Sequence, residues 1–412
     1  MIHTSHIRID LDAIAGNVRS IQAAVNTKTA ICPVVKADAY GLGADRVART
    51  LVSAGVNRLA VFTLQQAIQL ESRASHAKIL VLMPVQEIPN DPAIARLIAS
   101  GRLELVVSTR AQAIRLAATR FGRALPIHLE VDCGMGRAGA SIDDVPALIE
   151  EIVHRRSLQL VGIFTHFSSS LPEQVREEAA RFDAVLAKSD RLLPTRVIRH
   201  AASTGSCFSE PSQQRDMVRI GLGWTGWLPA KAVRYVPSET LQLRPAVTWC
   251  SQLFQVRELP AGATVGYGST WRAAKPTTVG LVPVGYSHGY PVGLVDPADP
   301  QRVLVAVGDS YRAVPVIGAV NMDQLVIDLS KLEGFEPQRD RQVILLSDQA
   351  DSAAGLHALS RRAGIQPHAL LCGLGASIPR VYLANGTSSS GGNADAAHVV
   401  EPSPGTSSMA AG

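Results

Sequence analysis

A single lysine marks the first part of the chain as a place where chemistry could occur. Lys36 interrupts the apolar start of VVKADAYGLG (34–43), although lysine is among the residues least often buried. A lysine amine can attack a carbonyl group and form a Schiff base. On a solvated loop the same amine would have no chemical role, so its neighbours in the fold decide between these interpretations.

Other candidate side chains recur further along the chain. They are Arg137 in the glycine-rich segment CGMGRAG, His166, Ser203, Thr204, Arg219, Gly221 and Leu222. Small hydroxyls and backbone amides bind phosphate, above all where a helix begins. Together with a lysine that can form a Schiff base and a nearby arginine, they favour pyridoxal phosphate as a cofactor. A barrel that binds a sugar phosphate is the alternative.

The elements that position these side chains alternate regularly. Runs of β-branched residues occur at 31–37, 58–63, 78–83, 103–108, 126–132, 158–166, 196–203 and 216–221. Amphipathic stretches with helical spacing lie between most of them, and the weakest follows the seventh run. Eight such units predict an N-terminal (β/α)8 barrel of the TIM type, with an open doubly wound sheet as the alternative. The candidates above then lie at the carboxyl ends of the strands, where barrel enzymes place their active sites.

The pattern changes after about residue 235. Short β-rich runs separated by Gly, Pro and Asp predict a mostly antiparallel β domain. We therefore expect a barrel domain over 1–235 and a β domain over 236–384. The remaining segment, 385–412, is rich in Ser, Gly and Ala and predicts a disordered tail.

Composition excludes several classes of function. The 412 residues carry a formal net charge of only +5, without a basic run that would bind nucleic acid. No apolar stretch is long enough to span a membrane, and the first residues lack the pattern of a signal peptide. The five cysteines form neither a CxxC pair nor a disulfide framework. We expect a cytoplasmic protein that acts on a small molecule, with no nucleic acid, membrane or metal partner.

A set of motifs in fixed order resembles the alanine racemase family of fold-type III pyridoxal-phosphate enzymes. The motifs are VVKADAYGLG, GMGRAG, FTHF, VRIGLGW, VGYGSTW, VPVGYSHGY and GAVNMDQ. They extend from about Ile7 to Tyr382, and the ordered set is more specific than any single motif. The resemblance implies an N-terminal barrel, a C-terminal β domain and a head-to-tail homodimer in which each subunit completes the other's active site.

The resemblance also implies a role for each matched residue. Lys36 would hold pyridoxal phosphate covalently, Arg219 would face its pyridine nitrogen, and His166 would lie beside Arg219. The residues that would bind the phosphate are Tyr40, Ser203, Thr204, Gly221 and Leu222. The residues that would lie near the amino-acid substrate are Arg137, Tyr286, Met322 and Asp323.

The reaction implied by the resemblance is the interconversion of L-alanine and D-alanine. Inversion at Cα requires a base on each face, because a single fixed base returns the proton to the face it left. Lys36 and the partner subunit's Tyr267 would be these bases, and Arg219 and His166 would complete the catalytic group. Arg219 would donate a hydrogen bond to the pyridine nitrogen without protonating it, which should suppress transamination. The product would supply D-alanine for peptidoglycan.

Three positions depart from the family pattern. Glu130 stands where the family often has a carbamylated lysine, and we expect its carboxylate to pair with Arg137. Ser203 replaces an asparagine, and Ala376 stands where a tyrosine often narrows access to the substrate. The loss of that tyrosine makes a racemase of broader specificity, acting on serine or larger amino acids, an alternative function.

Two further functions share parts of this pattern. A basic amino-acid decarboxylase of the same fold type would have a cysteine-bearing segment in place of Tyr267. A single-domain protein that binds pyridoxal phosphate without turnover would lack the β domain. Both fit the sequence less well than a racemase does.

Overall fold

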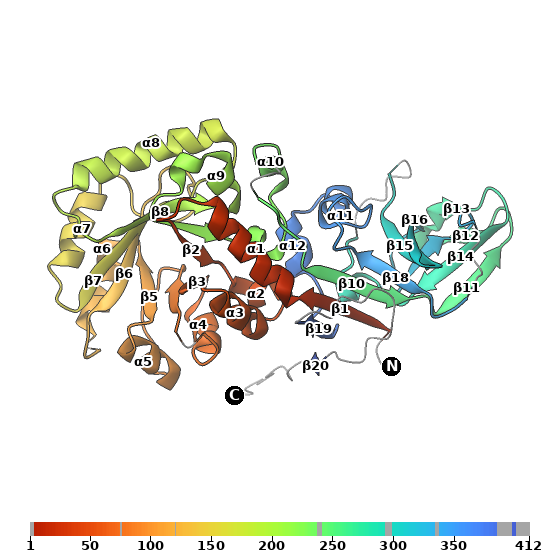
Figure 1. The fold of residues 1–412 in the computed structure, drawn as a ribbon, viewed down its shortest axis with the longest axis horizontal. Helices are drawn as coiled ribbons and strands as arrows, with labels where there is room; N and C mark the ends of the chain where they lie inside the picture. Colours follow the sequence, from red (N-terminus) through yellow and green to blue (C-terminus); the bar gives the residue numbers. More distant parts are fainter. Residues whose placement is uncertain are drawn as a thin grey trace. The chain divides into compact units, whose positions relative to one another are not determined.

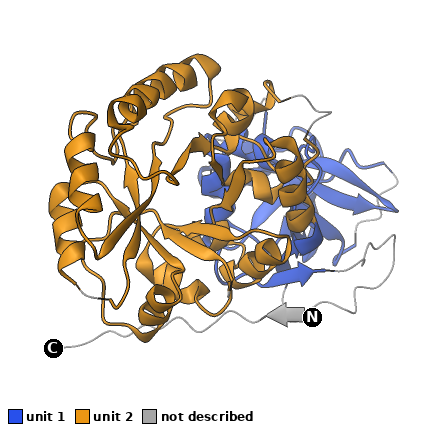
Figure 2. Ribbon diagram, turned by 60° about the vertical axis from the view of Figure 1, so that its left-hand side comes forward, with its two compact units in different colours: residues 1–12, 245–412 blue, residues 13–244 orange. Residues whose placement is uncertain are grey.

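The chain forms two compact units, Ala13–Arg244 and a second made of Met1–Asp12 with Pro245–Gly412 (Figure 2). The computed structural model describes residues 4–74, 76–119, 121–236, 241–292, 299–333, 338–384 and, for the backbone alone, 398–400. The sequence analysis placed the boundary near 235 and assigned the first residues to the barrel. The structure differs because strand β1 (Ser5–Asp10) pairs with strands of the second unit, so the amino-terminal residues belong there.

The first unit is built on eight parallel strands. They are β2 (Ala30–Pro33), β3 (Arg58–Val61), β4 (Lys78–Val81), β5 (Leu103–Val107), β6 (Leu125–Glu130), β7 (Leu158–Phe164), β8 (Ile198–Ser203) and β9 (Met217–Ile220). Each strand from β3 to β8 pairs with the next along the chain, and β9 pairs with β2. A bridge between Val34 and Ala60 joins the remaining edges, so the barrel is nearly closed. The (β/α)8 prediction is confirmed, and the open-sheet alternative is wrong.

Helices surround these strands on the outside of the barrel (Figures 1 and 2). They are α1 (Leu11–Ala24), α3 (Ala44–Ser53), α4 (Leu64–Leu70), α5 (Pro92–Ala99), α6 (Arg110–Ala118), α7 (Val145–Val153), α8 (Pro172–Ser189), α9 (Thr204–Ser209) and α10 (Ala230–Val233). The sequence sets several of their starts. Thr63 and Gln66 form a capping box on α4, and Asp91 caps α5 ahead of a proline. The helix after the seventh barrel strand, α9, has only six residues, in keeping with its weak sequence pattern.

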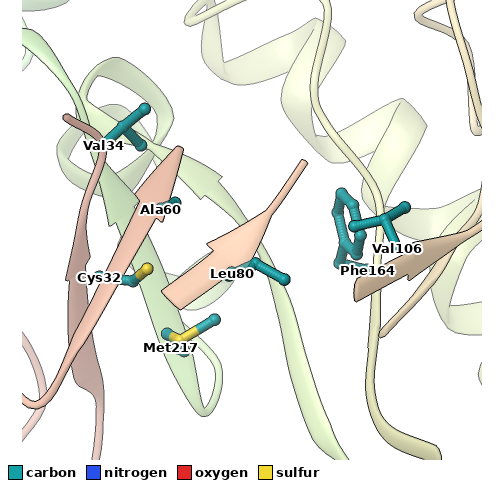
Figure 3. Packing of buried hydrophobic residues seen from close by; sticks show 7 residues of the cluster. All are labelled: Cys32, Val34, Ala60, Leu80, Val106, Phe164 and Met217. Carbon is teal, nitrogen blue, oxygen red and sulfur yellow. The ribbon is translucent and has the colours of Figure 1, made fainter. Parts of the chain in front are cut away.

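Apolar side chains fill the space enclosed by the barrel strands. One cluster consists of Cys32, Val34, Ala60, Leu80, Val106, Phe164 and Met217, all buried (Figure 3). The interior of such a barrel is a packed core and not a pore. Any polar side chain on the same inward face must therefore find its hydrogen-bond partners within the barrel.

The second unit is mostly antiparallel, as predicted. Its large sheet contains β1, β10 (Val247–Gln252), β11 (Gln255–Leu259), β14 (Thr277–Val282), β15 (Arg302–Val307), β16 (Ser310–Ile317), β17 (Leu325–Asp328), β18 (Gln342–Leu346), β19 (Arg380–Leu383) and β20 (His398–Val400). A two-stranded ribbon, β12 (Thr264–Val265) with β13 (Trp271–Arg272), and the helices α11 (Leu356–Ala363) and α12 (Pro367–Cys372) complete it.

The segment predicted to be a disordered tail, 385–412, lies outside the described residues except for β20, which pairs with β19. Among the helices of the described ranges, none has the length and apolar character needed to cross a membrane.

Candidate active site

Lys36 follows the first barrel strand after a short gap. Strand β2 stops at Pro33, and the lysine opens the helix α2 (Lys36–Gly41), so the predicted run 31–37 is longer than the strand. The side chain is half-buried, and its Nζ lies 5.8 Å from the centroid of the Phe62 ring, just beyond the end of β3. The amine therefore lies at the carboxyl ends of the strands, where barrel enzymes hold their reactive groups.

The four residues after Lys36 form a left-handed turn. From Ala37 to Tyr40, φ lies between 52° and 59°, although none of these residues is glycine. Each such residue costs roughly 1–2 kcal/mol relative to the right-handed conformation. Asp38 helps to hold the turn, because its carbonyl accepts the Gly43 N–H at 3.0 Å and its carboxylate accepts the Ala44 N–H at 2.7 Å. Backbone strain of this kind persists at functional sites, where the surrounding structure fixes it.

Tyr40, at the end of this turn, is buried against the segment that follows β9. Its ring stacks on that of Trp224, with the ring centroids 5.6 Å apart and the planes 5° apart. A Cβ atom at Gly221 would lie 2.7 Å from the Tyr40 hydroxyl oxygen, so only glycine admits the phenol at this point. The hydroxyl is thereby held beside the turn after β9.

Ser203 and Thr204 join β8 to α9 next to the same turn. The Thr204 hydroxyl oxygen accepts the N–H of Gly221 at 2.9 Å and that of Gly223 at 3.3 Å, which fixes the backbone after β9. Ser203 is the N-cap of α9, and Leu222 is buried within the turn. The five residues predicted to bind phosphate therefore gather at the ends of β8 and β9.

Arg219 is buried near the end of β9 and is held on one side by the barrel. Its Nη1 donates to His200 Nδ1 at 2.5 Å, and its Nη2 donates to the carbonyl oxygens of Thr165 and Ala201 at 2.9 and 3.0 Å. The guanidinium also lies over the Phe164 ring, 4.9 Å from its centroid. Burial lowers the pKa of Arg219 to about 10, so the group keeps its charge at neutral pH. Its Nε–H has no acceptor among the described residues and remains available to a ligand.

His166 accepts a hydrogen bond from the same guanidinium. Arg219 Nη2 lies 3.1 Å from His166 Nδ1. Burial lowers the pKa of His166 to about 3, so the imidazole is neutral at neutral pH. The charges of Arg219, Arg137 and Lys36 add to this shift, so three cations of the predicted site act on one ring. Because Nδ1 accepts, the proton must lie on Nε2, and that atom can donate to another group.

Glu130 and Arg137 lie on either side of the turn after β6, but they do not pair. The Glu130 carboxylate is buried, and its Oε2 has no hydrogen-bond partner in the described part of the chain. Arg137 is exposed. Burial raises the pKa of Glu130, although the charges of Arg219 and Arg137 oppose the rise. An unsatisfied buried acceptor is therefore left at the carboxyl end of β6, where the sequence analysis expected an ion pair.

Three polar residues that sequence reasoning did not single out lie in the barrel interior behind Arg219. His200, His128 and Glu104 are all fully buried. His128 Nδ1 lies 2.9 Å from His200 Nε2, and His128 Nε2 lies 3.2 Å from Glu104 Oε2. Arg58 donates to both oxygens of Glu104, at 2.7 and 3.1 Å. Glu104 and His128 each interrupt a run that is otherwise largely apolar, but a solvent-facing position of an ordinary strand has the same pattern, so the sequence did not signal their place in the interior.

The remaining candidates lie together in the second unit. Tyr267, Met322 and Asp323 line a hollow of about 440 Å³. Tyr286 lies on the adjoining turn, where its N–H donates to the Asn321 carbonyl oxygen at 3.1 Å. Tyr267 is 79% exposed and Met322 is 54% exposed, so these large side chains find little cover within their own unit.

Comparison with known proteins identifies the family. The family described as alanine racemase, N-terminal domain, matches residues 9–229, and alanine racemase, C-terminal domain, matches residues 246–382. The chain belongs to the alanine racemase family. Alanine racemase 2 of Caldanaerobacter subterraneus subsp. tengcongensis is 30% identical over 93% of this chain and 96% of its own length. The solved alanine racemase of Streptomyces lavendulae, 27% identical, covers 93% of this chain and 98% of its own with a TM-score of 0.80.

Membership of the alanine racemase family gives the enzyme class and the cofactor, and it confirms the resemblance seen in the motifs. The chain is an isomerase of the amino-acid racemase class. Alanine racemases depend on pyridoxal phosphate. A Bartonella henselae alanine racemase, solved with pyridoxal phosphate covalently bound, has the same fold with a TM-score of 0.77 and 24% identity, covering 92% of this chain and 100% of its own.

Proposed function

We propose that this racemase interconverts L-alanine and D-alanine by a two-base mechanism, with Lys36 on one face of Cα and the partner subunit's Tyr267 on the other. The proposal rests on one observation. Lys36, Arg219 and several hydroxyl and backbone N–H groups that could bind a phosphate lie together at the carboxyl ends of the barrel strands. We further propose that the enzyme works in the cytoplasm and supplies D-alanine for peptidoglycan.

The residues at the rim fit pyridoxal phosphate. Lys36 supplies the amine for a covalent bond, and the Tyr40 and Ser203 hydroxyls with nearby backbone N–H groups suit the phosphate. Arg219 has an N–H donor to spare for the pyridine nitrogen. The unsatisfied Glu130 oxygen is a further group that a bound ligand, or an arginine drawn in by it, would satisfy. When bound, pyridoxal phosphate delocalises negative charge from Cα and so makes the Cα proton acidic.

Arg219 and His166 both act in the proposed site as hydrogen-bond donors that keep their protons. With a pKa of about 10 and its charge retained, Arg219 donates a hydrogen bond without giving up the proton. The cofactor nitrogen it faces would therefore gain a hydrogen bond and no positive charge, which disfavours transamination. His166 carries its proton on Nε2 and can stabilise a phenolate by donating to it, which supports a tyrosine base on that side.

The exposure of Tyr267, Met322 and Tyr286 supports a homodimer. Large apolar side chains that are exposed together mark surfaces that another molecule covers. In the proposed head-to-tail dimer, this surface of one copy faces the barrel rim of the other. Asp323 and Met322 would then approach the substrate carboxylate from the partner, and Arg137 would approach it from the barrel.

The proposed function is tested by incubating the purified protein with pyridoxal phosphate and either alanine enantiomer. We expect both to reach an equal mixture, measured by chiral chromatography, with kcat on the order of 1–1000 per second. Release of carbon dioxide in the same tubes should stay at the level of a protein-free control. L-serine, assayed in parallel, should turn over at least about tenfold more slowly if the pocket selects alanine.

Each of the other possible outcomes would indicate a different function. Carbon dioxide release would indicate a decarboxylase, and binding of cofactor without turnover would indicate a carrier. Serine turnover equal to that of alanine would indicate the broader racemase that the exposed Ala376 suggests. Any of the three would contradict an alanine-selective racemase.

We expect Glu130→Gln to raise the KM for alanine about tenfold with little change in kcat, because the carboxylate would act by orienting Arg137 toward substrate. The same change should stabilise the cofactor-free protein at neutral pH. Folding raises the pKa of Glu130, so stability is lost as pH rises through that pKa, and glutamine removes this loss. We expect Tm to rise by about 2 °C at neutral pH and to match wild type in acid.

The matched control is Glu150→Gln, because Glu150 is exposed on α7. It should change neither KM nor Tm. An unchanged KM in Glu130→Gln would exclude the orienting role.

A further inference from the structure

A continuous line of hydrogen bonds runs through the barrel from Arg219 to Arg58. Arg219 bonds His200 at 2.5 Å, His200 bonds His128 at 2.9 Å, and His128 bonds Glu104 at 3.2 Å. Glu104 in turn bonds Arg58. Glu104 lies near the amino end of β5, whereas Arg219 lies near the carboxyl end of β9, so the line connects the two ends of the barrel.

The direction of these hydrogen bonds is fixed at the Glu104 end. Arg58 and Lys78 both form ion pairs with the carboxylate, with Lys78 Nζ 3.1 Å from Oε1. Burial alone would raise the pKa of Glu104, but the hydrogen bonds and charges of His128 and Arg58 bring it well below its usual range. An ionised carboxylate can only accept, so His128 Nε2 must carry a proton and donate.

The hydrogen bond between the two histidine rings also has a fixed donor and acceptor. Arg219 can only donate, so His200 Nδ1 accepts from it, and a neutral His200 then carries its proton on Nε2. His200 Nε2 therefore donates to His128 Nδ1, which agrees with a proton on His128 Nε2. Burial and the nearby charges of Arg219, His128 and Arg58 lower the pKa of His200, which keeps that ring neutral.

Packing holds both rings in place. A Cβ atom at Gly162 would lie 2.0 Å from His128 Nδ1, so the glycine gives the first ring its space. His200 stacks on Phe164 with the ring centroids 4.7 Å apart, and the two imidazoles meet edge to face at 5.1 Å. The rings cannot rotate to reverse their hydrogen bonds without disturbing the core.

We infer that Glu104 is a positioning residue: by accepting from His128 it favours the proton positions on His128 and His200 that leave His200 Nδ1 as the acceptor, and this acceptor orients Arg219 toward the cofactor ring. The inference rests on the proposed function only for its consequence at the cofactor. The proton positions themselves are properties of the barrel.

The test uses the full-length protein with its histidines labelled with 15N. Correlation spectra distinguish the protonated ring nitrogen from the unprotonated one, and His128→Gln and His200→Gln assign the signals. In the wild-type protein, with or without pyridoxal phosphate, we expect both rings to carry the proton on Nε2. A proton on Nδ1 of either ring would overturn the inference.

The change that tests the role of Glu104 is Glu104→Gln, because an amide can donate as well as accept. We expect the Nδ1–H form to become populated on both rings, and the Kd for pyridoxal phosphate to rise about tenfold as Arg219 loses an acceptor. Glu151→Gln is the matched control. Glu151 is also buried and bonded to two arginines, Arg110 and Arg155, but it lies on α7 outside the barrel interior. The control should leave proton positions and cofactor affinity unchanged.

A second variant covers the case in which Glu104→Gln leaves Arg58 uncompensated and fails to fold. Arg58→Met/Glu104→Met removes both charges together, and we expect it likewise to populate the Nδ1–H form of both rings. Unchanged proton positions or cofactor affinity in the folded variant would overturn the inference. A wild-type protein without racemase activity would contradict the proposed function and leave the NMR prediction standing, so the two failures are distinguishable.

Discussion

Lys36→Ala should lower racemisation of either alanine enantiomer by at least about 10⁴-fold, because the change removes both the proposed covalent anchor of the cofactor and one of the two proposed bases. The amine is half-buried at the barrel rim beside Phe62, and its charge helps to lower the pKa of His166. Treatment with borohydride followed by mass spectrometry measures the anchor. We expect wild-type protein to carry the reduced cofactor on the peptide that contains Lys36, and the variant to carry none.

Two controls make the result specific. Lys188→Ala alters an exposed lysine that pairs only loosely, at 3.9 Å, with Asp143, and it should leave both measurements unchanged. Added methylamine should restore part of the activity of Lys36→Ala, because a free amine can take over as base. Racemisation within about tenfold of wild type in Lys36→Ala would show that another residue holds these roles.

The barrel was predictable from the sequence because its signals are local. Runs such as LELVVS and PIHLEVD are short, apolar and bounded by helical stretches, and each became a buried strand within two or three residues of the predicted limits. Once the barrel was predicted, the candidate site residues could be placed together at its rim, because the carboxyl ends of parallel strands share one edge. Lys36 was placed near that edge correctly, but its left-handed turn was not foreseen, because Ala37–Tyr40 contains no glycine to signal it.

Features that depend on distant contacts were not predictable. Strand β1 alternates buried and half-buried residues, but its partner β10 follows only after the whole barrel in the sequence, so its place in the second unit had no local signal. Glu104 and His128 resemble the solvent-facing positions of ordinary strands. Only closure of the barrel turns them inward, where Arg58 and His200 become their partners. The expected Glu130–Arg137 pair relied on family pattern alone, and the described residues leave that carboxylate without a partner.

Tyr267→Phe should lower racemisation about 10²–10⁴-fold in both directions, because inversion needs a base on each face and the variant lacks the base that we propose for one of them. The side chain is 79% exposed within its unit, so loss of the hydroxyl should leave the fold and Tm unchanged. One base survives in this variant. We therefore expect it to exchange the Cα proton of one alanine enantiomer with deuterated water and to lose exchange for the other. Equal exchange of both would contradict the assignment of opposite faces.

Mixed dimers decide whether Tyr267 acts across the dimer. Lys36→Ala and Tyr267→Phe proteins should each retain at most about 1% of the activity, but a dimer with one subunit of each contains one site with intact Lys36 and intact Tyr267 if the tyrosine comes from the partner. Random mixing makes half of the dimers mixed, and half of their sites are intact, so activity should recover to about a quarter of wild type. If Tyr267 served the barrel of its own chain, every site in the mixed dimer would lack one base. Co-expression that yields no recovery would therefore exclude the shared active site.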